Sequence, residues 1–77
     1  MKRVIVKSDD DANSKLAEGE SNIGWKNDEI YVSLDSGFDN LERMKMYELD
    51  IESEGRRVAR LTQLSFPDKA RFSLDPI

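Results

Sequence analysis

The side chains in this sequence that could do chemistry are carboxylates, lysines and arginines, because the chain contains neither histidine nor cysteine. An imidazole base, a thiolate nucleophile and a zinc site of the usual nitrogen or sulfur kind are therefore excluded. Catalysis by a carboxylate or a lysine would need a desolvated pocket that shifts its pKa. A chain of 77 residues has a core too small to enclose such a pocket readily. We therefore expect a protein that is not an enzyme and carries no cofactor.

The segment Asp9 to Glu20 (DDDANSKLAEGE) has the most specific local pattern in the chain. Oxygen ligands fall at its positions one, three, five and twelve, which are Asp9, Asp11, Asn13 and Glu20. Over these twelve residues the segment resembles the calcium loop of the EF-hand family, and the resemblance implies a calcium-responsive domain. Ser14 replaces the turn glycine of that family, and the flanking sequence does not read as helices. The alternative, a solvated acidic loop without a metal, is the reading we favour.

A second acidic pattern is the alternating set Glu48, Asp50 and Glu52. On a strand these carboxylates would stand about 6.5–7 Å apart on one face, a spacing that could imitate a phosphate backbone. Arg56 and Arg60 would neutralise two of them across a hairpin, so a structural role is favoured for this set.

The bases of the C-terminal part form a further set, which comprises Arg56, Arg57, Arg60, Lys69 and Arg71. On adjacent strands these side chains could contact phosphates. A net charge of −4 opposes that contact at long range, and the chain lacks a glycine-rich phosphate loop. A nucleic-acid-binding module that uses the hairpin arginines is therefore kept as an alternative function, and direct nucleic-acid binding is disfavoured.

The acidic excess lies in the first part of the chain. Residues 1–50 contain 12 acids and 7 bases, a net charge of −5, whereas residues 51–77 contain 4 acids and 5 bases, a net charge of +1. A tryptophan in the same part of the chain is either core or an interface anchor, because tryptophan is enriched at binding hot spots. We predict a partner-binding surface formed by Asp9, Asp10, Asp11, Glu18, Glu20, Trp25, Asp28 and Glu29.

Hydrophobic periodicity predicts mostly strands. β-branched and alternating residues indicate strands over 2–7, 23–25, 29–35 and 69–74. Residues 15–20 are compatible with a helical turn that Gly19 would end. Asp39 followed by Glu42 forms a capping box, which predicts a short helix near residues 39–45.

A hairpin is predicted around Ser53-Glu54-Gly55, with the glycine in the left-handed region. Pairing Glu52 with Arg56 matches opposite charges on one face and apolar residues on the other, and it places Arg57 on the inner face.

These elements predict an α+β, mostly β fold, a small antiparallel sheet of about five short strands with one short helix, in a single domain of residues 1–77. The longest apolar run, Val4-Ile5-Val6, is too short for a membrane span or a signal-peptide core. We therefore expect a cytoplasmic protein without a membrane partner, and the small core leaves a homodimer open.

The leading functional hypothesis is a non-enzymatic binding protein that acts by protein–protein contact. Its carboxylates would steer it, as an inhibitor or adaptor, to a partner protein with a basic surface, such as a nucleic-acid-binding surface. In size and charge it is similar to phage-encoded anti-defence proteins such as anti-CRISPR proteins, an analogy of composition that no motif accompanies.

Overall fold

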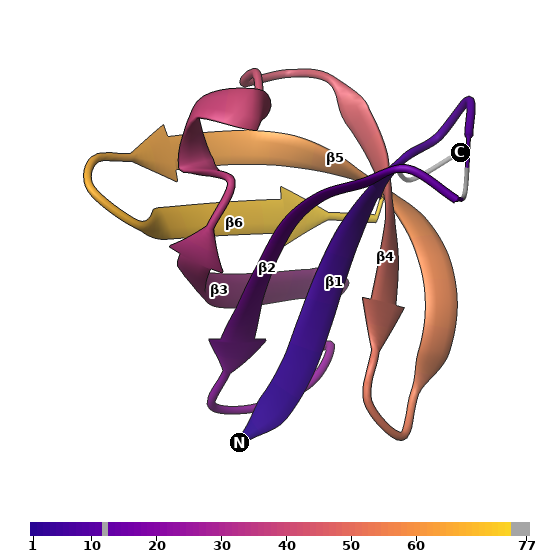
Figure 1. The fold of residues 1–77 in the computed structure, drawn as a ribbon. Coiled ribbons are helices and arrows are strands. Elements are labelled where there is room, and N and C mark those ends of the chain that lie inside the picture. Colours follow the sequence, from indigo (N-terminus) through magenta and orange to yellow (C-terminus); the bar gives the residue numbers. More distant parts are fainter. Residues whose placement is uncertain (12, 75–77) are drawn as a thin grey trace.

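The computed structural model describes residues 1–11 and 13–74 and contains a closed antiparallel β-barrel (Figure 1). Its strands are β1 (Lys2–Ser8), β2 (Lys15–Ser21), β3 (Glu29–Ser36), β4 (Met46–Ile51), β5 (Gly55–Ser65) and β6 (Lys69–Ser73). Around the barrel the order is β1-β2-β3-β6-β5-β4, and β4 pairs with β1 to close it. The fold is therefore all-β, with six strands rather than the predicted five.

The longest strand, β5, makes the closure possible. Its first half pairs with β4 through Gly55–Arg60, and its second half pairs with β6 through Arg60–Ser65. Between Leu61 and Gln63 the register with β6 shifts, and such a bulge bends a strand and increases its twist. The bend lets β5 pair with β4 along its first half and with β6 along its second half.

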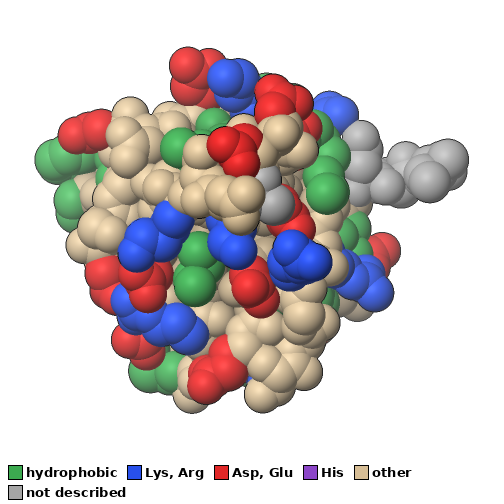
Figure 2. Space-filling view, turned by 45° about the vertical axis from the view of Figure 1, so that its right-hand side comes forward, with side chains coloured by type: hydrophobic (Ala, Val, Ile, Leu, Met, Phe, Trp, Pro, Cys, Tyr) green, Lys and Arg blue, Asp and Glu red, His purple; other side chains and the backbone are tan. Residues whose placement is uncertain are grey.

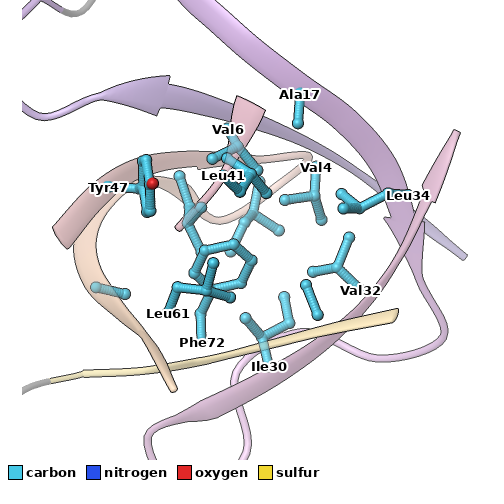
Figure 3. Close-up of a cluster of buried hydrophobic side chains, with 14 residues drawn as sticks. Val4, Val6, Ala17, Ile30, Val32, Leu34, Leu41, Tyr47, Leu61 and Phe72 are labelled. Atoms are coloured by element: carbon cyan, nitrogen blue, oxygen red, sulfur yellow. The ribbon is translucent and has the colours of Figure 1, made fainter. Parts of the chain in front are cut away.

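The interior is filled by one face of each strand, as the period of two requires (Figure 3). Phe72, Leu49 and Leu61 are fully buried near its centre, and the ring of Tyr47 meets the ring of Phe72 edge to face at 6.4 Å. The buried apolar residues are Val4, Val6, Ala17, Ile30, Val32, Leu34, Leu41, Tyr47, Leu49, Ile51, Ala59, Leu61, Ala70 and Phe72.

The helix predicted near residues 39–45 is wrong. Within the described residues the helical structure consists of the 3-10 turn η1 (Phe38–Asn40). No helix among these residues is long and apolar enough to cross a membrane. The backbone after η1 bonds to the barrel instead: the Met44 N–H donates to the Leu61 carbonyl at 2.6 Å, and the Glu42 N–H donates to the Tyr47 hydroxyl at 2.7 Å. Helix propensity over so few residues is too weak to compete with these tertiary bonds.

Two predictions around β2 are also wrong. Residues 15–20 form a strand rather than a helical turn, because β2 finds partners on both sides, in β1 and in β3. Residues 23–25 form part of a loop rather than a strand. The strands predicted over 2–7, 29–35 and 69–74 are confirmed as β1, β3 and β6, with ends that differ by at most one residue.

The predicted hairpin is confirmed, but its register is wrong by two residues. Ile51 pairs with Gly55 and Asp50 with Arg56, so the loop is Glu52 to Glu54. Gly55 lies in the left-handed region, as predicted, with φ of 83°. A shift of two residues leaves each side chain of β4 on its predicted face, so the apolar residues of β4 still point inward.

Arg57 keeps the strand face predicted for it, because it pairs with the inward-pointing Leu49, but its side chain is exposed rather than enclosed. The first residues of β5, from Gly55 to Val58, are all exposed, although Ile51 and Leu49 of β4, which pair with Gly55 and Arg57, are buried. The guanidinium therefore lies in solvent, where burial imposes no cost.

Gly19 on β2 allows a close approach to β3, and Gly19→Ala should therefore destabilise the barrel. A Cβ at this position would overlap the backbone carbonyl of Ser33, which cannot move without disturbing the sheet. We expect the free energy of unfolding, measured by urea denaturation, to fall by about 1–3 kcal/mol.

Gly24→Ala is the matched control for Gly19→Ala. The Cβ added at Gly24 would meet the side-chain carboxylate of Glu54, which can rotate away. An equal loss in the two variants would contradict the close approach of β2 and β3.

Candidate functional site

The predicted partner-binding residues do not form one continuous surface. Asp9, Asp10 and Asp11 lie at the tip of the β1–β2 hairpin, which precedes β2, whereas Asp28 lies in the connection that follows β2. Seven strand residues separate these two regions, so they stand at opposite ends of β2. The acidic front expected from the sequence is therefore divided between the two ends of the barrel.

Glu18 and Glu20 are held by a base from the neighbouring strand. Arg3 of β1 contacts Glu18 Oε2 through Nε at 2.9 Å and Glu20 Oε1 through Nη1 at 3.3 Å. Its Nη1 also donates to Asp35 Oδ2 of β3 at 2.6 Å, so one guanidinium joins the outer faces of three strands. The hydrogen bonds that Arg3 donates to the carboxylates of Asp35 and Glu18 raise the pKa of Arg3 above its ordinary value. The charges of Glu18 and Glu20 are largely compensated within the protein.

Positive and negative side chains are interspersed on the barrel surface seen in Figure 2. Two members of the set Glu48, Asp50 and Glu52 lie beside cations: Arg56 is 3.5 Å from Glu48, and Lys7 is 3.9 Å from Asp50. Glu52 accepts from the backbone N–H of Arg3 at 3.2 Å. The compensation predicted for this set is confirmed for Arg56, and β1 supplies the second cation.

Trp25 is partly buried and packs against the core. Its indole Nε1 is buried, and no hydrogen-bond acceptor for it lies among the described residues. The Trp25 backbone N–H approaches Glu54 Oε1 at 3.5 Å, which ties this loop to the β4–β5 hairpin. In this position Trp25 covers part of the barrel interior, in keeping with the core alternative for this residue.

The residues proposed as calcium ligands are not brought together. Asp9 and Asp11 lie before β2, whereas Glu20 lies near its far end, beside Arg3 of β1. Asp11 instead accepts from the Asn13 N–H at 3.0 Å and the Ser14 hydroxyl at 2.9 Å, which closes a local turn. Among residues 1–11 and 13–74, no three acidic side chains gather in an arrangement suited to a metal ion.

A surface groove crosses β3, β6 and β5 beside the connection between β2 and β3. Its volume is about 830 Å³, and it is open on one side. Side chains of both kinds line it, among them Ile23, Lys26, Tyr31, Gln63, Lys69 and Arg71. Tyr31 and Ile23 are the apolar members that solvent reaches, with exposed fractions of 62% and 55%.

The polar side chains of this groove are fixed by their neighbours. Tyr31 pairs with Arg71 across β3 and β6. Arg71 Nε donates to Thr62 Oγ1 at 3.2 Å and lies 3.9 Å from Glu29 Oε2. Lys69 Nζ donates to Ser33 Oγ at 2.9 Å. The groove is therefore a shaped surface on paired strands rather than on a loop.

A second exposed aromatic side chain stands close in the chain to this groove. Phe66 is 85% exposed and lies in the turn between Ser65 and Lys69, both of which line the groove. Its ring meets that of Phe38 edge to face at 5.9 Å, which restrains it in solvent.

The sequence predictions included several residues that line this groove but not Tyr31. Glu20 and Glu29 line it, as do Lys69 and Arg71 from the predicted basic set. Tyr31 was not predicted, although it stands on the polar face of an alternating strand, and that position is the signal that could have identified it.

Comparison with known proteins gives no significant match to a family model, to a curated protein or to a solved structure. Functional inference therefore depends on the groove and on the distribution of charge.

Acid should weaken this fold through Glu18 and Asp11. Hydrogen bonds from Lys15 and then Arg3 lower the pKa of Glu18 below 4.5, and those from Asn13 and Ser14 lower the pKa of Asp11 below 3.8. A lowered pKa means that the unfolded chain binds the proton more readily. The stabilisation is thus complete above the ordinary pKa and is lost as the pH falls through the folded value.

We expect the free energy of unfolding to decline below pH 4.5 and the Glu18→Gln variant to show a shallower decline. Asp39→Asn is the control, since its carboxylate has neither an ion pair nor a hydrogen bond in the part of the chain that the structure describes. Denaturation curves between pH 2 and pH 7 provide the measurement. Parallel curves for wild type and Glu18→Gln would show that the Glu18 contacts do not stabilise the fold.

Millimolar calcium should leave the melting temperature unchanged, because Asp9 and Glu20 stand at opposite ends of β2. A ligand that binds the folded state raises the melting temperature, so differential scanning fluorimetry is a direct measurement. A rise that Asp9→Ala abolishes would contradict the separation of these carboxylates.

Proposed function

We propose that this chain is a non-enzymatic binding domain that acts by protein–protein contact, as an inhibitor or adaptor. The observation that carries the proposal is the exposed ring of Tyr31 in a groove on paired strands. Binding hot spots are typically aromatic side chains that lose little conformational entropy on binding and are surrounded by polar groups.

The acidic hairpin tip supports a partner with a basic surface. Asp9 and Asp10 form no ion pair with any base among the described residues, in contrast to Glu18 and Glu20. Charges of this kind at the rim of a contact accelerate association and add less to affinity. The groove and the tip lie at opposite ends of β2, so a partner would have to reach both ends to use both.

Binding of single-stranded nucleic acid is the second candidate, and the proximity of Tyr31 to Arg71 and Lys69 favours it. Bases stack on exposed aromatic rings, and neighbouring cations follow the backbone. Glu20 and Glu29 line the same groove and would repel phosphates. We therefore rank this candidate below protein contact.

Tyr31→Ala should weaken capture of the partner protein strongly. Loss of a hot-spot side chain typically costs about 2 kcal/mol, which is about a 30-fold rise in Kd. The wild-type protein immobilised on beads would identify the partner in its native lysate, and biolayer interferometry with the purified partner would give the constants.

Val58→Ala is the matched control, because Val58 is also an exposed apolar residue of a strand but does not line the groove. A double Asp9→Lys, Asp10→Lys variant should slow association at low salt and leave dissociation unchanged. Unchanged binding by Tyr31→Ala, or retention of wild type on single-stranded DNA at low salt, would contradict the proposal.

A further inference from the structure

Strand β3 has unequal neighbours along its length. On one side it pairs with β6 from Glu29 to Ser33. On the other side its pairing with β2 involves Ser33, Leu34 and Ser36. Residues 29–32 therefore have no paired residue in β2, and this edge of β3 borders the groove.

The direction of the backbone groups along this edge follows from the hydrogen bonds on its two sides. Glu29 turns its N–H and carbonyl toward Lys26, with N···O distances of 3.0 and 2.8 Å. On the β6 side, the Leu34 N–H donates to the Asp68 carbonyl, and the Asp28 carbonyl accepts from the Leu74 N–H, both at 2.7 Å.

Backbone groups in an antiparallel strand alternate between its two edges. The even-numbered residues of β3 therefore point to β6, and the odd-numbered ones point to the opposite edge. Tyr31 lies between Glu29 and Ser33, so its N–H and carbonyl face away from β6, where no strand residue pairs with it. A donor and an acceptor on the edge of a sheet can receive an added strand.

The groove supplies the space for such a strand. The segment from Ser21 to Gly24 forms one wall of it, and β3 forms another. Above the free edge stands the exposed ring of Tyr31, which alternate side chains of an added strand would contact.

The groove lining carries three bases, Lys26, Lys69 and Arg71, against two acids, Glu20 and Glu29. Lys26 has no ion pair in the described part of the chain, and Lys69 lies 3.9 Å from the exposed carboxylate of its neighbour Asp68. Glu29 lies 3.9 Å from Arg71, and Glu20 lies 3.3 Å from Arg3, so both acids of the lining have a cation beside them. Isolated carboxylates would be attracted to Lys26 and Lys69, whereas a continuous phosphate backbone would also meet Glu20 and Glu29.

We infer that the groove binds an extended segment of a partner protein that carries acidic side chains, and that this segment adds to β3 as a strand through the N–H and carbonyl of Tyr31. The inference rests on the proposed function and names the recognition mode of the same groove. Main-chain bonds to Tyr31 fix the register, and Lys26 and Lys69 select carboxylates.

Amide hydrogen exchange of the free protein tests the open edge without any ligand. The Tyr31 N–H should exchange at least about tenfold faster than those of its neighbours Ile30 and Val32, which face β6. Equal protection of the three amides would overturn the inference, and it would leave the proposed function to be judged by partner capture.

The probe for binding is a library of ten-residue peptides in which valine alternates with a position randomised over all residues. Selection on the immobilised protein should enrich aspartate and glutamate over lysine and arginine. The double variant Lys26→Gln, Lys69→Gln should lose this preference and keep its fold. Absence of acidic enrichment with wild type would overturn the inference.

The best selected peptide should slow exchange of the Tyr31 N–H, and Tyr31→Pro, which removes that donor, should bind it at least about tenfold more weakly than Tyr31→Ala. Amide spectra would check that the proline variant is folded. If the proline variant is not folded, the exchange rate of the Tyr31 amide in the wild-type protein, measured with and without the peptide, tests the inference instead. An unchanged Tyr31 exchange rate, or binding of a ten-residue oligo-dT in place of the peptide, would overturn the inference.

Discussion

The double pairing of β5 is the constraint on which the rest of the structure depends. This strand serves β4 with its first half and β6 with its second, and the bulge between Leu61 and Gln63 gives it the necessary bend. With β4 also paired to β1, the sheet closes and encloses the buried side chains of all six strands. A chain of 77 residues buries a modest core, and closure lets both edges of the sheet contribute hydrogen bonds that an open sheet would leave to water.

Closure also determines how the charges are arranged outside. Adjacent strands place their outward side chains side by side, so Arg3 of β1 reaches Glu18 and Glu20 of β2 and Asp35 of β3. On the face seen in Figure 2, acidic and basic side chains are consequently interspersed. Exposed ion pairs of this kind add little to stability, and their larger effect is to remove carboxylates from the surface available to a partner.

The groove arises where two neighbouring strands do not match in extent. β2 ends at Ser21, and the chain turns back at Lys26 to Glu29 before β3 has met β2. One local mismatch therefore produces a hollow, an exposed Tyr31 and a segment of sheet edge in the same place. Recognition and folding make opposite demands here, since an unpaired edge weakens the sheet but offers main-chain bonds to a partner.

The sequence by itself determined the inward and outward faces of β1, β3, β4 and β6, because apolar residues such as Ile30, Val32 and Leu34 recur at every second position. It also determined the β4–β5 hairpin, since few residues other than Gly55 suit a positive φ there. The register of that hairpin, the strand β2 and the turn over 42–45 were decided by the tertiary structure. Each of them depends on hydrogen bonds to segments distant in sequence, and local propensity contains no information about such bonds. The groove belongs to the same group, because its walls come from β2, β3, β5 and β6 and meet when the barrel closes.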